Sequence, residues 1–246
     1  MYLIILFVGG ILAGLYGSTV GSGGLISLPL VLLTGLPIHT AIATNRFGAT
    51  LLELSSAARF HKEKELNIKL GLLFGVTAAL GSFIGSNLVI NFDEKYLNLI
   101  TAILLVSIFL ILIFKNKLGI REKIISHKHW LIAAMSTFLL GIYGGFLGVG
   151  FGTLITFVFV LIGLNFVRSA AVSRVVGLIM SAVATAVFAF NGLINYPYAL
   201  ALGLGLAIGG WIGAGIGVKK GNDYIKLLFI IILLATIAKL VFEFLK

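Results

Sequence analysis

Three charged residues stand inside stretches of the sequence that are otherwise apolar. Arg46 and Arg174 each lie early in a long apolar segment, and Glu53 follows Arg46 by seven residues, which places both on roughly one face of a helix. A guanidinium stays protonated and offers planar, forked donors that suit the oxygens of a small oxyanion. We expect the two arginines to form a positive cradle. The alternatives are that each one reaches a lipid headgroup or pairs with a carboxylate.

The polar neighbours of the arginines are candidates for the same site. Thr44 and Asn45 precede Arg46, and Ser173 precedes Arg174. These side chains could donate to an oxyanion or cap a helix. Glu53 could carry a proton or act as a fixed counter-ion for Arg46, and both alternatives stay open.

Two glycine-rich clusters interrupt the apolar sequence, at residues 17–24 and 144–152. Non-helical backbone inside a bilayer exposes amide and carbonyl groups, so it persists only when it is buried in protein or lines a wet cavity. Paired interruptions at matching positions are typical of a transporter's substrate site, where freed amides favour an anion. Close helix packing is the alternative interpretation. The candidate residues are Gly21, Ser22, Gly23, Gly24, Gly148, Gly150 and Gly152.

The elements that must position these residues are apolar helices. Of 246 residues, 60% are hydrophobic and 11% are charged, whereas a soluble domain has about 45–50% apolar and about 25% charged residues. We therefore expect an all-α polytopic membrane protein with one domain, residues 1–246. The net charge of +10 resides in short loops, which favours cytoplasmic loops against anionic lipid headgroups rather than a nucleic-acid partner.

The chain repeats itself. Gly14-Leu15-Tyr16-Gly17 recurs as Gly141-Ile142-Tyr143-Gly144, an offset of 127 residues, and after one inserted residue the offset is 128. Further matched pairs are Gly35/Gly163, Arg46/Arg174, Asn67/Asn195, Gly81/Gly209 and Tyr96/Tyr224. We expect two halves, 1–117 and 128–246, joined by a basic cytoplasmic loop at 115–129.

Each half contains four apolar segments, of which the first is broken by its glycine cluster. The expected segments are 1–36, 41–60, 67–90 and 94–115, then 129–163, 169–190, 196–218 and 222–245. If the first segment is one broken span, the halves are parallel; if it folds back as a hairpin, they are inverted. Inverted halves collect more Lys and Arg on the cytoplasmic side, so the positive-inside rule favours that arrangement. The spaced glycines Gly81/Gly85 and Gly205/Gly209/Gly213 predict close helix contacts.

Enzymatic chemistry has little support in the sequence. There is no cysteine, and the four histidines lie in or beside loops, so we expect no catalytic dyad, metal site or cofactor.

These motifs resemble the sulfite exporter TauE/SafE family, also called TSUP. The resemblance rests on G-L-Y-G-S-T-V-G-S-G-G-L-I-S-L-P at 14–29, on the Gly35-Leu36-Pro37 turn with the residues after it, and on the two-half layout. The second half departs from the motif, with Thr156 in place of Pro29 and Phe151 in place of Gly24.

The resemblance implies a prokaryotic plasma-membrane transporter of small sulfur-containing anions such as sulfite or organosulfonates. We expect alternating access at a midplane site, with or without a coupled proton. An anion channel and a non-transport scaffold are the alternatives.

Overall fold

All regular structure in the described part of the chain is helical, as expected. The computed structural model describes residues 1–21, 23–89 and 127–244. The predicted helix at 94–115, most of the joining loop and Ser22 lie outside these residues. The helices are α1 (Tyr2–Val20), α2 (Gly24–Leu32), α3 (Ile38–Lys62), α4 (Ile68–Leu88), α6 (His127–Phe146), α7 (Phe151–Ile162), α8 (Phe166–Phe190) and α9 (Tyr196–Phe244).

Local sequence explains where several helices begin and end. The Asn67 side chain accepts a hydrogen bond from the Leu70 amide (3.1 Å) at the start of α4, and Asn165 accepts one from the Arg168 amide (2.9 Å) at the start of α8. The left-handed backbone of Gly21 (φ 88°) ends α1, a conformation that glycine adopts without steric cost.

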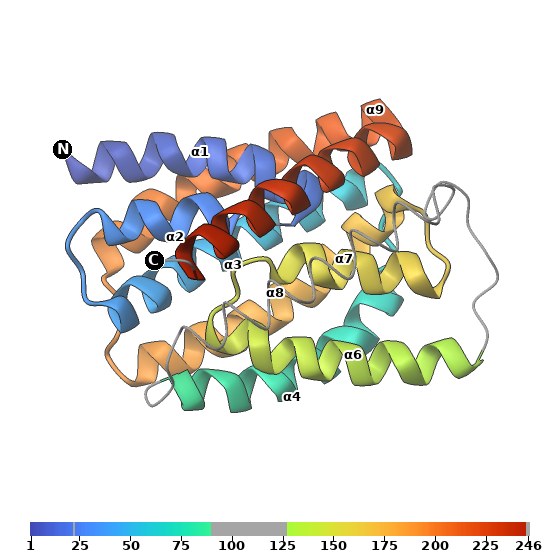
Figure 1. The fold of residues 1–246 in the computed structure, drawn as a ribbon, viewed down its shortest axis with the longest axis horizontal. Coiled ribbons are helices and arrows are strands. Elements are labelled where there is room, and N and C mark those ends of the chain that lie inside the picture. Colours follow the sequence, from blue (N-terminus) through green and yellow to red (C-terminus); the bar gives the residue numbers. More distant parts are fainter. Residues whose placement is uncertain (22, 90–126, 245–246) are drawn as a thin grey trace.

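Each glycine cluster folds the chain back into a hairpin. The nine residues of α2 return along α1, so Gly9 lies against the Leu30 side chain and Gly17 lies against Gly23. In the second half, α7 returns along α6 and Phe151 contacts Gly144. Figure 1 shows the α1–α2 reversal near the middle of the molecule. The first segment of each half is therefore a hairpin and not a single broken span.

The helices of the two halves pack across each other. The first helix of one half contacts the helix that follows the arginine helix of the other, so α1 packs on α9 and α6 packs on α4. In the same way α3 contacts α9 and α8 contacts α4, while α3 and α8 meet each other. In Figure 1, α1 runs from left to right and α6 from right to left.

Glycines allow these cross-half contacts to be close. A Cβ at Gly85 would overlap the Ile142 carbonyl of α6, and one at Gly209 would overlap the Ile11 carbonyl of α1. Small residues let helix backbones approach in this way. The predicted packing role of the spaced glycines is confirmed, and the contacts lie within one chain.

Within residues 1–21, 23–89 and 127–244, four helices are long and apolar enough to cross a membrane. These candidate spans are Tyr2–Thr19, Ile68–Leu88, Phe166–Phe190 and Tyr196–Leu227. The two predicted helices at 196–218 and 222–245 are continuous in α9, but Gly221 is non-helical (φ 81°, ψ −171°) and the chain turns back there. The predicted boundary is therefore confirmed as a sharp bend.

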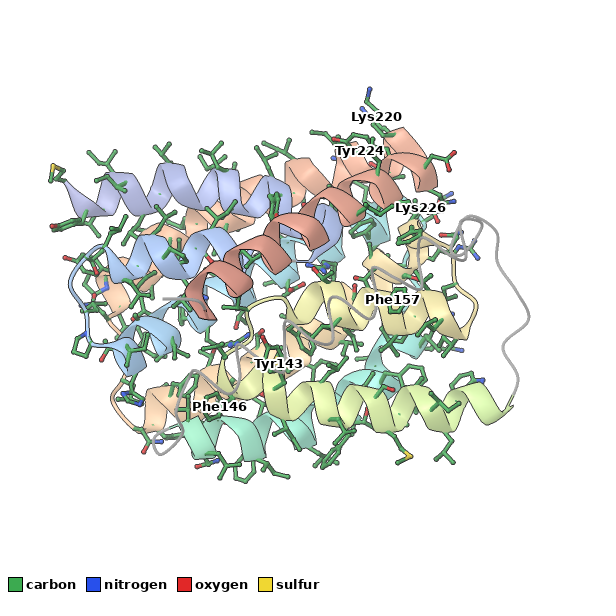
Figure 2. All side chains as sticks on the ribbon, viewed as in Figure 1. Tyr143, Phe146, Phe157, Lys220, Tyr224 and Lys226 are labelled. Atoms are coloured by element: carbon green, nitrogen blue, oxygen red, sulfur yellow. The ribbon has the colours of Figure 1, made fainter. Side chains whose placement is uncertain are left out.

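Positive charge gathers at one end of the molecule. The turn between α3 and α4, the start of α8 and the bend of α9 lie together at the right of Figure 1, and Figure 2 shows Lys220 and Lys226 beside that bend. These segments, called the basic end below, carry Arg59, Lys62, Lys64, Lys69, Arg168, Lys219, Lys220 and Lys226.

Candidate anion site

The two arginines occupy equivalent positions in the fold. Arg46 is the ninth residue of α3 and Arg174 the ninth residue of α8. Their side chains are only 4% and 1% exposed. A guanidinium buried this deeply does not reach a lipid headgroup, so the snorkelling alternative is wrong for both residues.

Each arginine donates a hydrogen bond to a hairpin of the opposite half. Arg46 Nη2 donates to the Gly144 carbonyl (2.5 Å), near the end of α6. Arg174 Nη1 donates to the Gly17 carbonyl (3.2 Å), in the last turn of α1. Because Gly17 and Gly144 are themselves matched in the repeat, the two contacts are related by the same internal correspondence as the arginines.

Glu53 pairs with Arg174 and not with its helix neighbour Arg46. Arg174 Nη1 donates to Glu53 Oε1 (3.2 Å) and lies 3.1 Å from Oε2. The carboxylate also lies close to Gly177, where a Cβ would touch the carboxylate carbon at 2.9 Å. Glu53 is therefore a counter-ion, but it pairs with Arg174 of the other half and not with Arg46 as the sequence suggested.

The hairpin tips meet beside these charges. The backbone of Gly21 lies directly against that of Gly152, and Gly24 is in ordinary contact with Val149. Gly148 (φ 71°) lies so close to the Arg46 guanidinium that a Cβ would overlap it. The site is therefore built where side chains are absent, which brings backbone amides and carbonyls up to the arginines.

Several buried polar atoms at this site have no hydrogen-bond partner in the described part of the chain. They include Arg46 Nε, Arg174 Nη2 and Asn45 Oδ1. A buried donor without a partner costs about 1–3 kcal/mol, and more for a charged group. Each of the two buried arginines therefore keeps a guanidinium nitrogen whose hydrogen-bonding capacity is unused by the described residues.

The remaining candidate residues make hydrogen bonds or packing contacts within the helix bundle. Thr44 accepts a hydrogen bond from the Asn195 amide (3.0 Å), and the Ser173 hydroxyl lies 2.8 Å from that of Thr156. Gly23 packs on Gly17 inside the first hairpin, and Gly150 (φ 79°) precedes α7. Ser22 lies outside the described residues.

The sequence interpretation missed three backbone contacts that complete the site. The Gly17 and Gly144 carbonyls accept from the arginines, and Gly177 makes room for Glu53. The Tyr143 hydroxyl donates to the Val149 carbonyl, which ties the end of α6 to the turn before α7. The repeated Gly-x-Tyr-Gly motif was a signal for the first two and for Tyr143, whereas Gly177 had none.

Among the described residues, no three His, Asp or Glu side chains are grouped so that they could hold a metal ion.

Comparison with known proteins gives a consistent result over the whole chain. The model of the family described as sulfite exporter TauE/SafE matches residues 6–240. A probable membrane transporter protein of Haemophilus influenzae is 28% identical over 242 residues, covering 98% of this chain and 95% of its own length. Similar proteins are the probable membrane transporter protein ORF9 of Sinorhizobium sp (29% identical; 97% and 92% covered) and the probable membrane transporter protein YfcA of Escherichia coli K12 (25% identical; 97% and 89% covered). No solved structure matches the chain.

Proposed function

The chain belongs to the sulfite exporter TauE/SafE family, and from this premise we propose that it is a secondary transporter of small anions that works by alternating access. The family and the relatives indicate a multi-pass membrane transporter rather than an enzyme. The observation that carries the anion proposal is the pair of buried, equivalent arginines with unpartnered N–H groups at the hairpin tips.

The charges at the centre favour an anion. Two guanidinium groups face one carboxylate there, so one positive charge is uncompensated. The first turns of α2 and α7 begin at the hairpin tips, and helix N-termini carry partial positive charge. A monovalent oxyanion would neutralise the excess charge and accept the free N–H groups.

An inverted relation between the halves would give this site two access routes. The opposite directions of α1 and α6, and the crossed pairing of α1 with α9 and α6 with α4, support that relation. In this proposal the halves rock about the hairpin tips, and the site opens first to one side and then to the other.

Glu53 offers a route to proton coupling. In the ion pair, Nη1 of Arg174 contacts the Glu53 carboxylate and is not available to a substrate. Protonation of the carboxyl would release Arg174 for the substrate, so uptake of a proton and binding of an anion would favour each other. The equivalent position in the second half is Ser181, so coupling would involve one proton carrier.

The proposed substrates are sulfite and organosulfonates. The family description supports sulfite, and the planar fork of a guanidinium suits the oxygens of both sulfite and sulfonate groups. The flexible ammonium of a lysine would not reproduce this geometry.

Uptake into proteoliposomes tests the proposal. Radiolabelled sulfite, sulfoacetate, taurine and sulfate would be compared for the natural protein, Arg46→Ala, Arg174→Ala and the control Arg59→Ala, whose side chain pairs with Glu63 at the basic end. Loss of one charge-assisted hydrogen bond, worth about 1.5–3 kcal/mol, should lower anion uptake about 10- to 150-fold in the first two variants only.

The same assay separates the rival mechanisms. A carrier shows saturable uptake and is accelerated by unlabelled anion on the opposite side, whereas a channel is not. Stimulation by a pH gradient that disappears in Glu53→Gln would support proton coupling. Uptake that survives both arginine substitutions would refute the proposed site, and absence of uptake for every anion would favour a scaffold.

A further inference from the structure

A cavity opens at the basic end of the molecule, away from the arginine pair. It has a volume of about 450 Å³, within the range of small-molecule sites, and lies between the α3–α4 turn and the start of α8. Lys64, Lys69 and Arg168 line it together with the acid Glu65. Arg168 Nε lies 3.5 Å from Glu65 Oε2, so the cavity keeps an excess of positive charge.

The cavity reaches into the helix bundle. Val172 also lines it, and this residue is fully buried in the structure. On α8, Val172 stands two residues before Arg174 and one turn after Arg168. The cavity and the buried guanidinium therefore lie close together along one helix, on different faces of it.

The position equivalent to Val172 in the other half holds a residue that makes a hydrogen bond. At the offset of 128 residues, Thr44 stands where the second half has Val172, and its hydroxyl accepts the hydrogen bond of the Asn195 amide (3.0 Å). Phe47 and Tyr196 pack edge to face nearby, with ring centroids 6.2 Å apart. Val172 has no hydroxyl, so it cannot accept the matching hydrogen bond from the amide of Asn67, just before α4.

The cations that line the cavity have no charged equivalents in the other half. The positions equivalent to Lys64, Lys69 and Arg168 are Gly192, Pro197 and Thr40. The two ends of the bundle thus differ in two ways. One has the basic cavity, and the other has no matching cations and is tied by the Thr44–Asn195 hydrogen bond.

We propose that the cavity lined by Lys64, Lys69 and Arg168 is a second, outer binding site for oxyanions, which the substrate occupies before it reaches the buried arginines. This inference rests on the proposed transport function for its route, but the binding itself does not require transport. Surface cations that line a concave site raise the local concentration of anions and their rate of arrival.

The absence of cysteine from the sequence makes a direct test possible. Leu164 lines the cavity and is partly exposed, so Leu164→Cys places a single thiol there. Leu36→Cys, the equivalent and also partly exposed position at the other end, is the matched control. The rate of modification would be measured with anionic sulfonatoethyl methanethiosulfonate and with cationic trimethylammonioethyl methanethiosulfonate.

The expected result is a preference of about tenfold for the anionic reagent at Leu164→Cys, relative to Leu36→Cys. The preference should largely disappear when Lys64, Lys69 and Arg168 are all replaced by Gln. Sulfoacetate, which does not react with the thiol, should slow modification at Leu164→Cys and leave Leu36→Cys unchanged.

Two results would overturn the proposal. One is an equal reagent preference at both positions. The other is protection that occurs only in bilayers containing phosphatidylglycerol and never with free sulfoacetate, which would make the cavity a lipid headgroup site. Charge preference and protection without any anion uptake would instead uphold the outer site and refute the transport function.

Discussion

The buried ion pair between Glu53 and Arg174 should be a main determinant of stability. Glu53 is 7% exposed and Arg174 1%, so neither charge is screened by solvent when its partner is removed. Truncating one partner of a buried pair costs about 3–5 kcal/mol, because the other charge stays buried. We expect Glu53→Ala and Arg174→Ala each to lower the free energy of unfolding by about 3 kcal/mol or more.

The double substitution should cost about 2 kcal/mol less than the sum of the two single ones, which is within the range for charges in contact. Unfolding by sodium dodecyl sulfate in mixed micelles, followed by circular dichroism, would measure all four proteins. A second cycle with Glu53→Ala and Arg46→Ala is the control, since Arg46 bonds to Gly144 in the described structure. If the first cycle is additive within about 0.5 kcal/mol, or couples no more than the second, the ion pair does not have the assigned role.

Two further substitutions test local contacts. Gly148→Ala should lower both the melting temperature and anion uptake, because the methyl group would overlap the adjacent guanidinium; Gly35→Ala, which also has positive φ but open space around it, should cost only about 1 kcal/mol and retain uptake. Equal effects in thermal melting and uptake assays would contradict this difference. Thr44→Val should remove the acceptor for the Asn195 amide, cost about 1–3 kcal/mol and increase labelling of a thiol at Leu36; unchanged labelling would show that the hydrogen bond does not close that end.

The fold was largely predictable because its signals are repeated and local. The offset between the halves matched equivalent helices, and apolar length identified the segments that the structure describes as α3, α4 and α8. Glycine in the left-handed region ends α1, as a glycine cluster predicts. Loop charge favoured the hairpin arrangement, and the hairpins are present.

The partners of the charged residues were less predictable. Helix periodicity placed Glu53 beside Arg46, yet the carboxylate bonds to Arg174 on another helix. That choice depends on how α3 packs against α8, which no spacing within one segment reveals. The repeated Gly-x-Tyr-Gly motif marked Gly17 and Gly144 as matched residues, but no residue type showed that their carbonyls accept hydrogen bonds from the arginines.

The crossed packing of the two halves affects how the protein is made. Helix α1 packs on α9, which is synthesised long after it, and α4 packs on α6, which also follows it along the chain. The glycine faces of these early helices therefore stay without their native partners during most of synthesis. The arginine contacts join the two halves, so each forms only after the later partner has been synthesised: Arg46 waits for Gly144, and Gly17 waits for Arg174.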